Sequence, residues 1–253
     1  GVELGAIAQL FVENIESQPA PKGYLKAFDP LTGETRWSQE TPHYWNGGVL
    51  ATAGGLVFQG NALGFFRAFD KETGELLWEF NTYTSMLAPP IAFEVDGKQY
   101  VSILTGTGGG DLFSGEPLPP VAEHASLTYS NEGRLLVFAL GGEAQLPPPN
   151  IRDRTIPEQN MAGITLEEIQ MGERQYNEYC SLCHGLVARS GGAIADLRRM
   201  PQAKHMIFND IVLDGALAAS GMAGFRDVLT QEQVEAIQSY VRARAEEDRL
   251  AAA

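Results

Sequence analysis

The stretch Leu25–Trp37 (LKAFDPLTGETRW) recurs as Phe66–Trp78 (FRAFDKETGELLW), displaced by 41 residues along the chain. In each copy an apolar run ends at an Asp, Thr-Gly supplies a hairpin turn, and a second run ends on a Trp. A period of about 40 to 45 residues built from short strands is typical of the four-stranded blade of a β-propeller. A large aromatic residue at one place in each blade can fill the gap between neighbouring sheets. The repeat therefore predicts propeller blades, with a small open sandwich of two similar hairpins as the alternative.

Further strands are expected around this repeat, and together they do not make a closed ring. Short apolar runs separated by glycine-containing turns predict strands at 48–52, 56–59, 91–95, 99–104 and 134–140. At one blade per repeat, the first half of the chain holds about 3.5 blades, fewer than the roughly 4 to 8 that close a propeller. Unfinished blades leave exposed sheet edges, which favour aggregation. We therefore expect another polypeptide, an N-terminal portion of the same gene product, to complete the ring; self-association is the alternative.

A proline run separates this half from one with a different pattern. The segment Gln145–Asn150 (QLPPPN) favours a stiff extended chain and continues neither a sheet nor a helix. We expect propeller blades in residues 1–144, a proline-rich linker in 145–160 and an all-α domain in 161–253.

The all-α half carries a cysteine motif. Thr165 and Glu168 form a capping box that predicts a helix, and Cys180-Ser181-Leu182-Cys183-His184 follows. This is the c-type haem attachment pattern. Two thiols three positions apart can bond to the two vinyl groups of one porphyrin, and the adjoining imidazole then becomes an axial ligand of the iron. A redox disulfide and half of a zinc site are the alternatives, but the first expects a βαβ context and the second expects further clustered ligands.

A sixth iron ligand is expected downstream of the motif. Met222 is the preferred candidate because it lies in a glycine-flanked loop just before the final helix; Met200 and Met206 are the alternatives. The Thr230/Gln233 capping box predicts that this helix covers about 230–246. Two of its residues, Ile237 and Tyr240, are expected to dock on the face of the earlier helix that carries Gly172 and Tyr176. The two helices can cross closely because Gly172 has no side chain.

Composition excludes two classes of partner. The 32 acidic and 18 basic residues give a net charge of −14, which disfavours binding to nucleic acid. No run approaches the roughly 20 apolar residues needed to span a bilayer, so we expect no membrane span. The sequence begins at Gly1 without a Met, which we interpret as a processed or cut product.

Taken together, these motifs resemble the type II quinohaemoprotein alcohol dehydrogenases. The resemblance covers nearly the whole chain and is carried by residues 23–30, 45–60, and 180–184 with Met222. It implies the last blades of an eight-bladed propeller that binds pyrroloquinoline quinone (PQQ), followed by a class I cytochrome c domain. It also implies that Trp45 and Asn46 contact PQQ, whereas an inter-blade filler and a turn residue are the alternatives for these two.

Other parts of the family's active site have no counterpart here. The family's catalytic Asp, calcium ligands and vicinal-cysteine disulfide belong to earlier blades, so we expect no catalytic residue in this chain and expect calcium to be held by the N-terminal portion. Two positions depart from the family pattern: Thr107 stands where relatives tend to have Trp, and Ala223 stands where a proline usually follows the Met.

The function implied by the resemblance is alcohol oxidation at PQQ, with electrons passing through haem c to a small external acceptor such as a cupredoxin or cytochrome. The metal ligands implied for the haem iron are His184 and Met222. Attachment of haem c takes place outside the cytoplasm in bacteria, so the periplasm is the expected location. The alternatives are a non-enzymatic electron-transfer protein docked through its propeller module, and a quinoprotein that acts on sugars or aldehydes.

Overall fold

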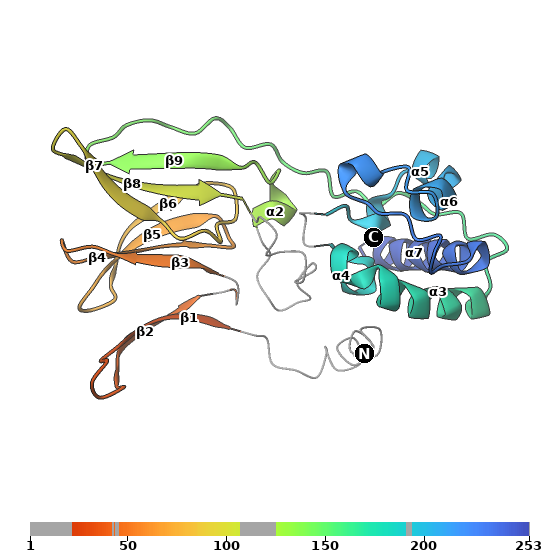
Figure 1. Ribbon diagram of the computed structural model, residues 1–253, viewed down its shortest axis with the longest axis horizontal. Coiled ribbons are helices and arrows are strands. Elements are labelled where there is room, and N and C mark those ends of the chain that lie inside the picture. The colour runs from red at the N-terminus through yellow and green to blue at the C-terminus, as the bar shows by residue number, and fades with distance from the viewer. Residues whose placement is uncertain (1–21, 42, 44–45, 107–124, 191–193, 253) are drawn as a thin grey trace. The chain divides into compact units, whose positions relative to one another are not determined.

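Strands occupy the first half of the described chain and helices the second, as Figure 1 shows for the computed structural model. The structure describes residues 22–252 except 42, 44–45, 107–124 and 191–193. Trp45 and Thr107 therefore lie outside the described residues. Within that part the chain forms two compact units, one ending at Arg152 and the other beginning at Asp153.

Three antiparallel sheets make up the first unit. One is two-stranded (β1-β2), one is four-stranded (β3-β4-β5-β6) and one is three-stranded (β7-β8-β9). The strands are β1 (Gly23–Phe28), β2 (Thr35–Thr41), β3 (Asn46–Ala51), β4 (Leu56–Asn61), β5 (Phe65–Asp70), β6 (Leu76–Asn81), β7 (Ile91–Val95), β8 (Lys98–Thr105) and β9 (Arg134–Ala139). A short helix, α2 (Ala125–Thr128), precedes β9. The strands expected from the sequence are present, and β3–β6 has the four-stranded meander of a propeller blade.

The two copies of the repeat form the same hairpin. β1 pairs with β2, and β5 with β6, in matching registers, and both ladders are irregular between the same Ala and Phe of the repeat. In the first turn the Asp29 carboxylate accepts hydrogen bonds from the backbone of the residues two and three positions on, and the glycine that closes the turn has a φ of 75°. In the second, Asp70 accepts the equivalent bonds and Gly74 has a φ of 74°. Only glycine adopts this left-handed conformation at little cost, which explains the shared Thr-Gly.

The tryptophan of each copy packs between neighbouring sheets. The Trp37 indole N–H donates to the Lys71 carbonyl at 2.9 Å, and a Cβ added at Gly74 would meet the Trp37 ring at 2.6 Å. Trp78 lies on the next sheet boundary, with its ring centroid 5.4 Å from that of Phe138. The predicted role of this residue as a filler between sheets is therefore confirmed for both copies.

Alternating side chains of the central sheet face its two neighbours. On β4, Val57 joins a buried cluster with Leu25 and Phe69 beneath β1-β2. Its neighbour Phe58 points the other way and packs on a second cluster around Phe66, which includes side chains of the β7-β8-β9 sheet. The period of two along a strand thus places one apolar layer on each side of β3–β6.

The outer face of β7-β8-β9 carries no such layer. The strand register puts alternate residues of the three strands on this face, opposite the side that packs on Phe66. Six large apolar residues on it are 39 to 63% exposed: Ile91, Phe93, Val95, Leu104, Leu135 and Val137. These six residues share one sheet face, which also carries Tyr100 and Ser102 of β8.

The second unit is built from helices and short turns. They are α3 (Leu166–Tyr179), α4 (Ser181–His184), the 3-10 turns η3 (Leu186–Ala188) and η4 (Leu197–Arg199), α5 (Gln202–Met206), α6 (Phe208–Val212), the 3-10 turn η5 (Ala218–Ser220) and α7 (Gln231–Ala251). Both predicted capping boxes are present, Thr165 with Glu168 and Thr230 with Gln233. α7 continues to Ala251, beyond the predicted end near 246, because its last turns are held by ion pairs that no local pattern announces.

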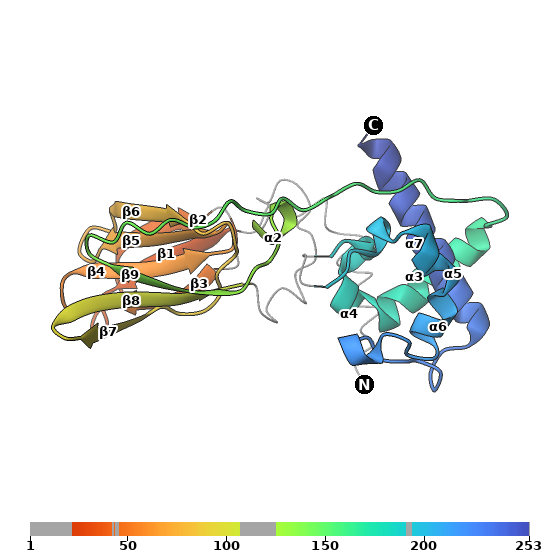
Figure 2. The ribbon, with the colours of Figure 1, turned by 90° about the horizontal axis from the view of Figure 1, so that it is seen from above.

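Helices α3 and α7 cross closely, as Figure 2 shows. A Cβ on Gly172 would lie 1.9 Å from the Ala236 carbonyl oxygen and 2.9 Å from the Cβ of Tyr240. The rings of Tyr176 and Tyr240 are 5.2 Å apart, and both side chains are buried. The predicted close crossing at Gly172 is confirmed, and it creates the core of this unit.

The proline-rich segment forms neither helix nor extended sheet. Residues 142–160 are irregular apart from one bridge between Ile151 and Tyr129. The end of this segment is hydrogen-bonded to helix α7. The Gln159 N–H donates to the Glu246 carboxylate, and the Asn160 carbonyl accepts from Arg242.

Across the described chain, the helices are all too short or too polar to cross a bilayer.

Candidate functional site

The cysteine pair lies where α3 ends and α4 begins. Cys180 closes α3, with its N–H donating to the Tyr176 carbonyl at 2.8 Å, and its side chain is buried. Cys183 lies one turn further on and is exposed, and both thiols are free. Burial, with the nearby Cys183 adding to it, raises the pKa of Cys180 to about 12. Redox-active cysteines have lowered pKa values, so this environment disfavours the dithiol–disulfide alternative.

The His184 imidazole is buried and oriented by one hydrogen bond. Its Nδ1 lies 2.9 Å from the Ala195 carbonyl oxygen, and because a carbonyl only accepts, Nδ1 carries the proton. Among the described residues nothing hydrogen-bonds to Nε2. Burial lowers the pKa of His184, against the opposing effects of the Ala195 bond and the charge of Asp196. The ring is thus held neutral with one unshared nitrogen lone pair, the form that ligates a metal.

These donors fit a c-type haem. Two free thiols and an oriented neutral imidazole lie within five consecutive residues, which is the donor set that covalent attachment requires. Within the described residues no group of three or more His, Cys, Asp or Glu side chains gathers as metal ligands.

The three candidate methionines have different surroundings. Met200 is buried in the helical core, Met206 is 73% exposed, and Met222 is half-buried and packs against the edge of that core. The loop that carries Met222 is closed at its base, where the Phe225 N–H donates to the Val212 carbonyl at 2.8 Å. Gly224 allows this close approach, since a Cβ there would meet the Leu213 carbonyl at 2.9 Å.

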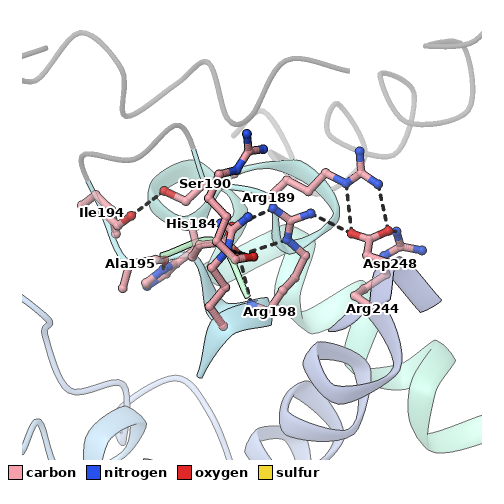
Figure 3. Close-up of polar contacts among 12 residues, drawn as sticks. His184, Arg189, Ser190, Ile194, Ala195, Arg198, Arg244 and Asp248 are labelled. Carbon is pink, nitrogen blue, oxygen red and sulfur yellow. Dashed lines mark hydrogen bonds and ion pairs between the residues drawn. The ribbon is translucent and has the colours of Figure 1, made fainter. Parts of the chain in front are cut away.

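An ionic network that no sequence motif predicts lies beside His184 (Figure 3). Asp248 of α7 accepts hydrogen bonds from Arg189, Arg198 and Arg244. Burial alone would raise the pKa of Asp248, but the hydrogen bonds and charges of the arginines outweigh it and hold that pKa below its usual range. Arg198 also pairs with Asp196, the residue that follows Ala195.

Of the residues expected at the quinone, only Asn46 is described. Its Nδ2 donates to the Thr41 hydroxyl and to the His43 carbonyl, each at 2.9 Å. Its Oδ1 is buried and has no hydrogen-bond partner in the described part of the chain. As placed, the two amide hydrogens that a quinone oxygen would need are therefore already used within the chain.

Comparisons with known proteins match each unit separately. Residues 39–101 match the family model described as "Glucose/ethanol/alcohol dehydrogenase, beta-propeller domain". Residues 167–241 match the model described as "Cytochrome C oxidase, cbb3-type, subunit III", and this range includes the cysteine motif and Met222. The chain is thus similar to a quinoprotein propeller over part of its strand-rich unit and to a cytochrome over most of its helical unit.

Relatives with both parts are similar over most of the chain. It is 42% identical to quinohemoprotein alcohol dehydrogenase ADH IIB of Pseudomonas putida over 90% of its own length and 33% of that protein. It is 37% identical to lupanine 17-hydroxylase [cytochrome c] of a Pseudomonas species, over 88% of its length and 32% of that protein. The solved structure of ADHIIG from Pseudomonas putida HK5 superposes with a TM-score of 0.80 at 35% identity, covering 89% of this chain and 32% of that one.

The chain is therefore a homologue of the quinohaemoprotein alcohol dehydrogenases, and it spans about a third of the length of the relatives it matches.

Proposed function

We propose that this chain is the C-terminal portion of a periplasmic PQQ- and haem c-containing alcohol dehydrogenase. In this proposal an N-terminal propeller portion supplies the catalytic Asp and the calcium site. When bound, PQQ would supply the electron acceptor for alcohol oxidation, and haem c would supply one-electron transfer toward a small external acceptor such as a cupredoxin or cytochrome.

The environment of His184 is the observation that carries the proposal. Its imidazole is buried, neutral and oriented by the Ala195 carbonyl, and its Nε2 is left to coordinate the haem iron. Cys180 and Cys183 would hold the porphyrin by thioether bonds, and Met222 would complete the coordination. Full coordination by His and Met favours electron transfer over oxygen chemistry.

The apolar residues on the outer face of β7-β8-β9 support the proposal that an N-terminal propeller portion packs on this unit. Six large apolar side chains on one sheet face are 39 to 63% exposed, and apolar residues gathered on one face favour a protein–protein contact. A neighbouring blade would cover this face in the way that the central sheet covers the opposite face. The relatives are about three times as long as this chain, so they contain enough residues for the missing blades.

A haem-attachment assay tests the core of the proposal. The full chain, secreted by a host that matures cytochromes c, should retain haem after denaturing electrophoresis. Cys180→Ala together with Cys183→Ala should abolish this retention, whereas Ser181→Ala, between the two cysteines, should leave it intact. A wild-type chain without covalent haem would refute the proposal.

A reconstitution assay tests the enzymatic part. The chain is co-expressed with the N-terminal portion of a relative such as ADH IIB, and PQQ and calcium are added. Reduction of a dye by primary or secondary alcohols is the expected result. If a complex that contains haem and PQQ oxidises only sugars or aldehydes, these are the substrates in place of alcohols. If it oxidises none of these compounds, the result favours a non-enzymatic electron carrier.

A further inference from the structure

We propose that Asp248 is a positioning residue for the His184 imidazole, acting through the loop whose Ala195 carbonyl holds Nδ1. The inference rests on the proposed haem attachment at His184. It adds a role for a residue that lies 64 positions further along the chain, near the end of α7.

Asp248 ties two segments of the loop to one helix. The Arg189 guanidinium binds it through two bonds, Nη2 to Oδ1 at 2.8 Å and Nε to Oδ2 at 3.2 Å. Arg198 Nη1 donates to Oδ2 at 2.8 Å. Arg189 follows His184 by five residues and Arg198 follows Ala195 by three, so the carboxylate fixes both ends of the loop that returns to the imidazole (Figure 3). Arg198 is 3% exposed and Asp248 is 9% exposed, which shields both from competing water.

The path from Arg198 to His184 is short. Arg198 also chelates the Asp196 carboxylate, with Nη2 to Oδ2 at 2.6 Å and Nε to Oδ1 at 3.0 Å. Asp196 is bonded through the peptide to Ala195, whose carbonyl accepts from His184 Nδ1. The bidentate Arg198–Asp196 pair, joined to Asp248 by a single hydrogen bond from Arg198, restricts rotation of this peptide.

The other end of the loop is strained. Val187 and Ala188 have φ values of 51° and 61°, and side-chain-bearing residues, β-branched ones above all, rarely adopt these values. Such conformations are energetically unfavourable and persist only where neighbouring contacts enforce them. Arg189, the next residue, supplies such a contact through Asp248. Ser190 adds a second contact, with its hydroxyl donating to the Ile194 carbonyl at 2.5 Å.

General stabilisation does not account for this arrangement well. Taking two charges out of water costs about as much as their attraction returns, so a buried ion pair is a weak source of stability. A network of this kind instead specifies one arrangement of its chain segments. Here the arrangement is the one that presents the Ala195 carbonyl to His184.

The hydrogen bond to Ala195 affects how strongly the His184 imidazole donates electrons to the haem iron. A hydrogen bond from Nδ1 raises the basicity of Nε2 and fixes the orientation of the ring. A more basic ligand favours the oxidised iron, so weakening this bond should raise the reduction potential of the haem. Two variants of opposite charge separate this effect from simple electrostatics.

The test compares Asp248→Asn and Arg189→Gln in the full haem-loaded chain, with Glu247→Gln as control. Charge alone predicts opposite shifts, because Asp248→Asn removes a negative group and Arg189→Gln removes a positive one. Positioning predicts that both variants raise the midpoint potential, and that Asp248→Asn raises it the more. The expected change for Asp248→Asn is at least tenfold in the equilibrium constant for reduction, which is about 59 mV for a one-electron couple. Glu247 is 68% exposed and pairs only with Arg244 among the arginines of the network, so its neutralisation leaves the bonds of Arg189 and Arg198 to Asp248 in place and should have little effect.

A second readout observes the hydrogen bond directly. In the reduced protein, exchange of the His184 Nδ1 proton with solvent, followed by NMR, should accelerate at least tenfold in both variants and remain unchanged in Glu247→Gln. Arg189→Lys, which keeps the charge but not the bidentate geometry, should recover part of the protection.

The outcomes are distinguishable. Asp248→Asn leaves Arg198 with fewer partners, and this variant could fail to retain haem for that reason. In that case Arg189→Gln tests the inference, because it keeps Arg198 paired with Asp248 and Asp196. Haem-loaded variants whose potentials shift in opposite directions, or whose Nδ1 exchange equals that of the wild type, would overturn the inference alone. A wild-type chain that attaches no haem would overturn it together with the proposed function.

Discussion

Replacing Gly172 with alanine tests the closest contact in the helical unit. The new Cβ would lie 1.9 Å from the Ala236 carbonyl oxygen, so the backbone of α7 must withdraw by about 1.1 Å to restore a 3.0 Å separation. The obstacle is a backbone atom and cannot rotate away. The cost therefore lies near the upper end of the overpacking range, about 3 kcal/mol.

Alanine also has a favourable effect at this position. In a helix interior it is about 1 kcal/mol better than glycine. The net expectation is a loss of about 2 kcal/mol, and with an m-value of about 2 kcal/mol/M this lowers the urea midpoint by about 1 M.

Circular dichroism in the helical region measures this unit selectively, because the other described unit is almost entirely β. Arg174→Ala, an exposed change two residues away on the same helix, should stay within about 0.5 kcal/mol of the wild type. An unchanged or higher urea midpoint for Gly172→Ala would refute the close-crossing argument.

Three further predictions concern other parts of the molecule. Burial, with a contribution from the charge of Arg242, lowers the pKa of His205 from 6.5 to about 4. Between these values the unfolded chain binds more protons than the folded one, so stability should fall by up to about 3 kcal/mol as the pH drops from 6.5 to 4. His205→Gln should flatten the plot of urea midpoint against pH over that range, and an equally steep plot would contradict the assignment. Met222→Ala should abolish the far-red sulfur-to-iron absorption of oxidised haem and Met206→Ala should retain it; survival of the band in Met222→Ala would indicate Met200 or Met206 as the ligand. Trp37→Ala should destabilise the β unit by about 3 kcal/mol in fluorescence-monitored unfolding, against no change for Leu31→Ala, which is 94% exposed in the adjacent turn; equal midpoints for the two would contradict a packing role for Trp37.

Features governed by neighbouring residues were predictable from the sequence. The two hairpins follow from an Asp and a Thr-Gly within a few positions, and both helix starts follow from a residue and its partner three places on. The cysteine motif is contained in five residues. Even the contact between α3 and α7 could be anticipated, because a glycine on the apolar face of a helix marks where another backbone can approach.

The contacts that define the surroundings of His184 could not be anticipated in this way. Asp248 occurs in a run of charged residues at the end of a helix, a pattern that usually indicates a solvated surface. Its partners Arg189 and Arg198 lie 59 and 50 residues away. The hydrogen bond from the Asn46 amide to the His43 carbonyl likewise could not be predicted from the sequence, because an asparagine side chain at this position is compatible with either a ligand contact or a structural one.

The amino-acid sequence by itself therefore determined the propeller blades, the helical unit and the cysteine–histidine motif that we propose binds haem, because each of these is encoded by spacing over a few positions. Only the tertiary structure decided which carbonyl orients His184 and which carboxylate fixes that carbonyl. Those contacts join distant segments, and no periodicity or spacing distinguishes a charge that will be buried and paired from one that stays in water.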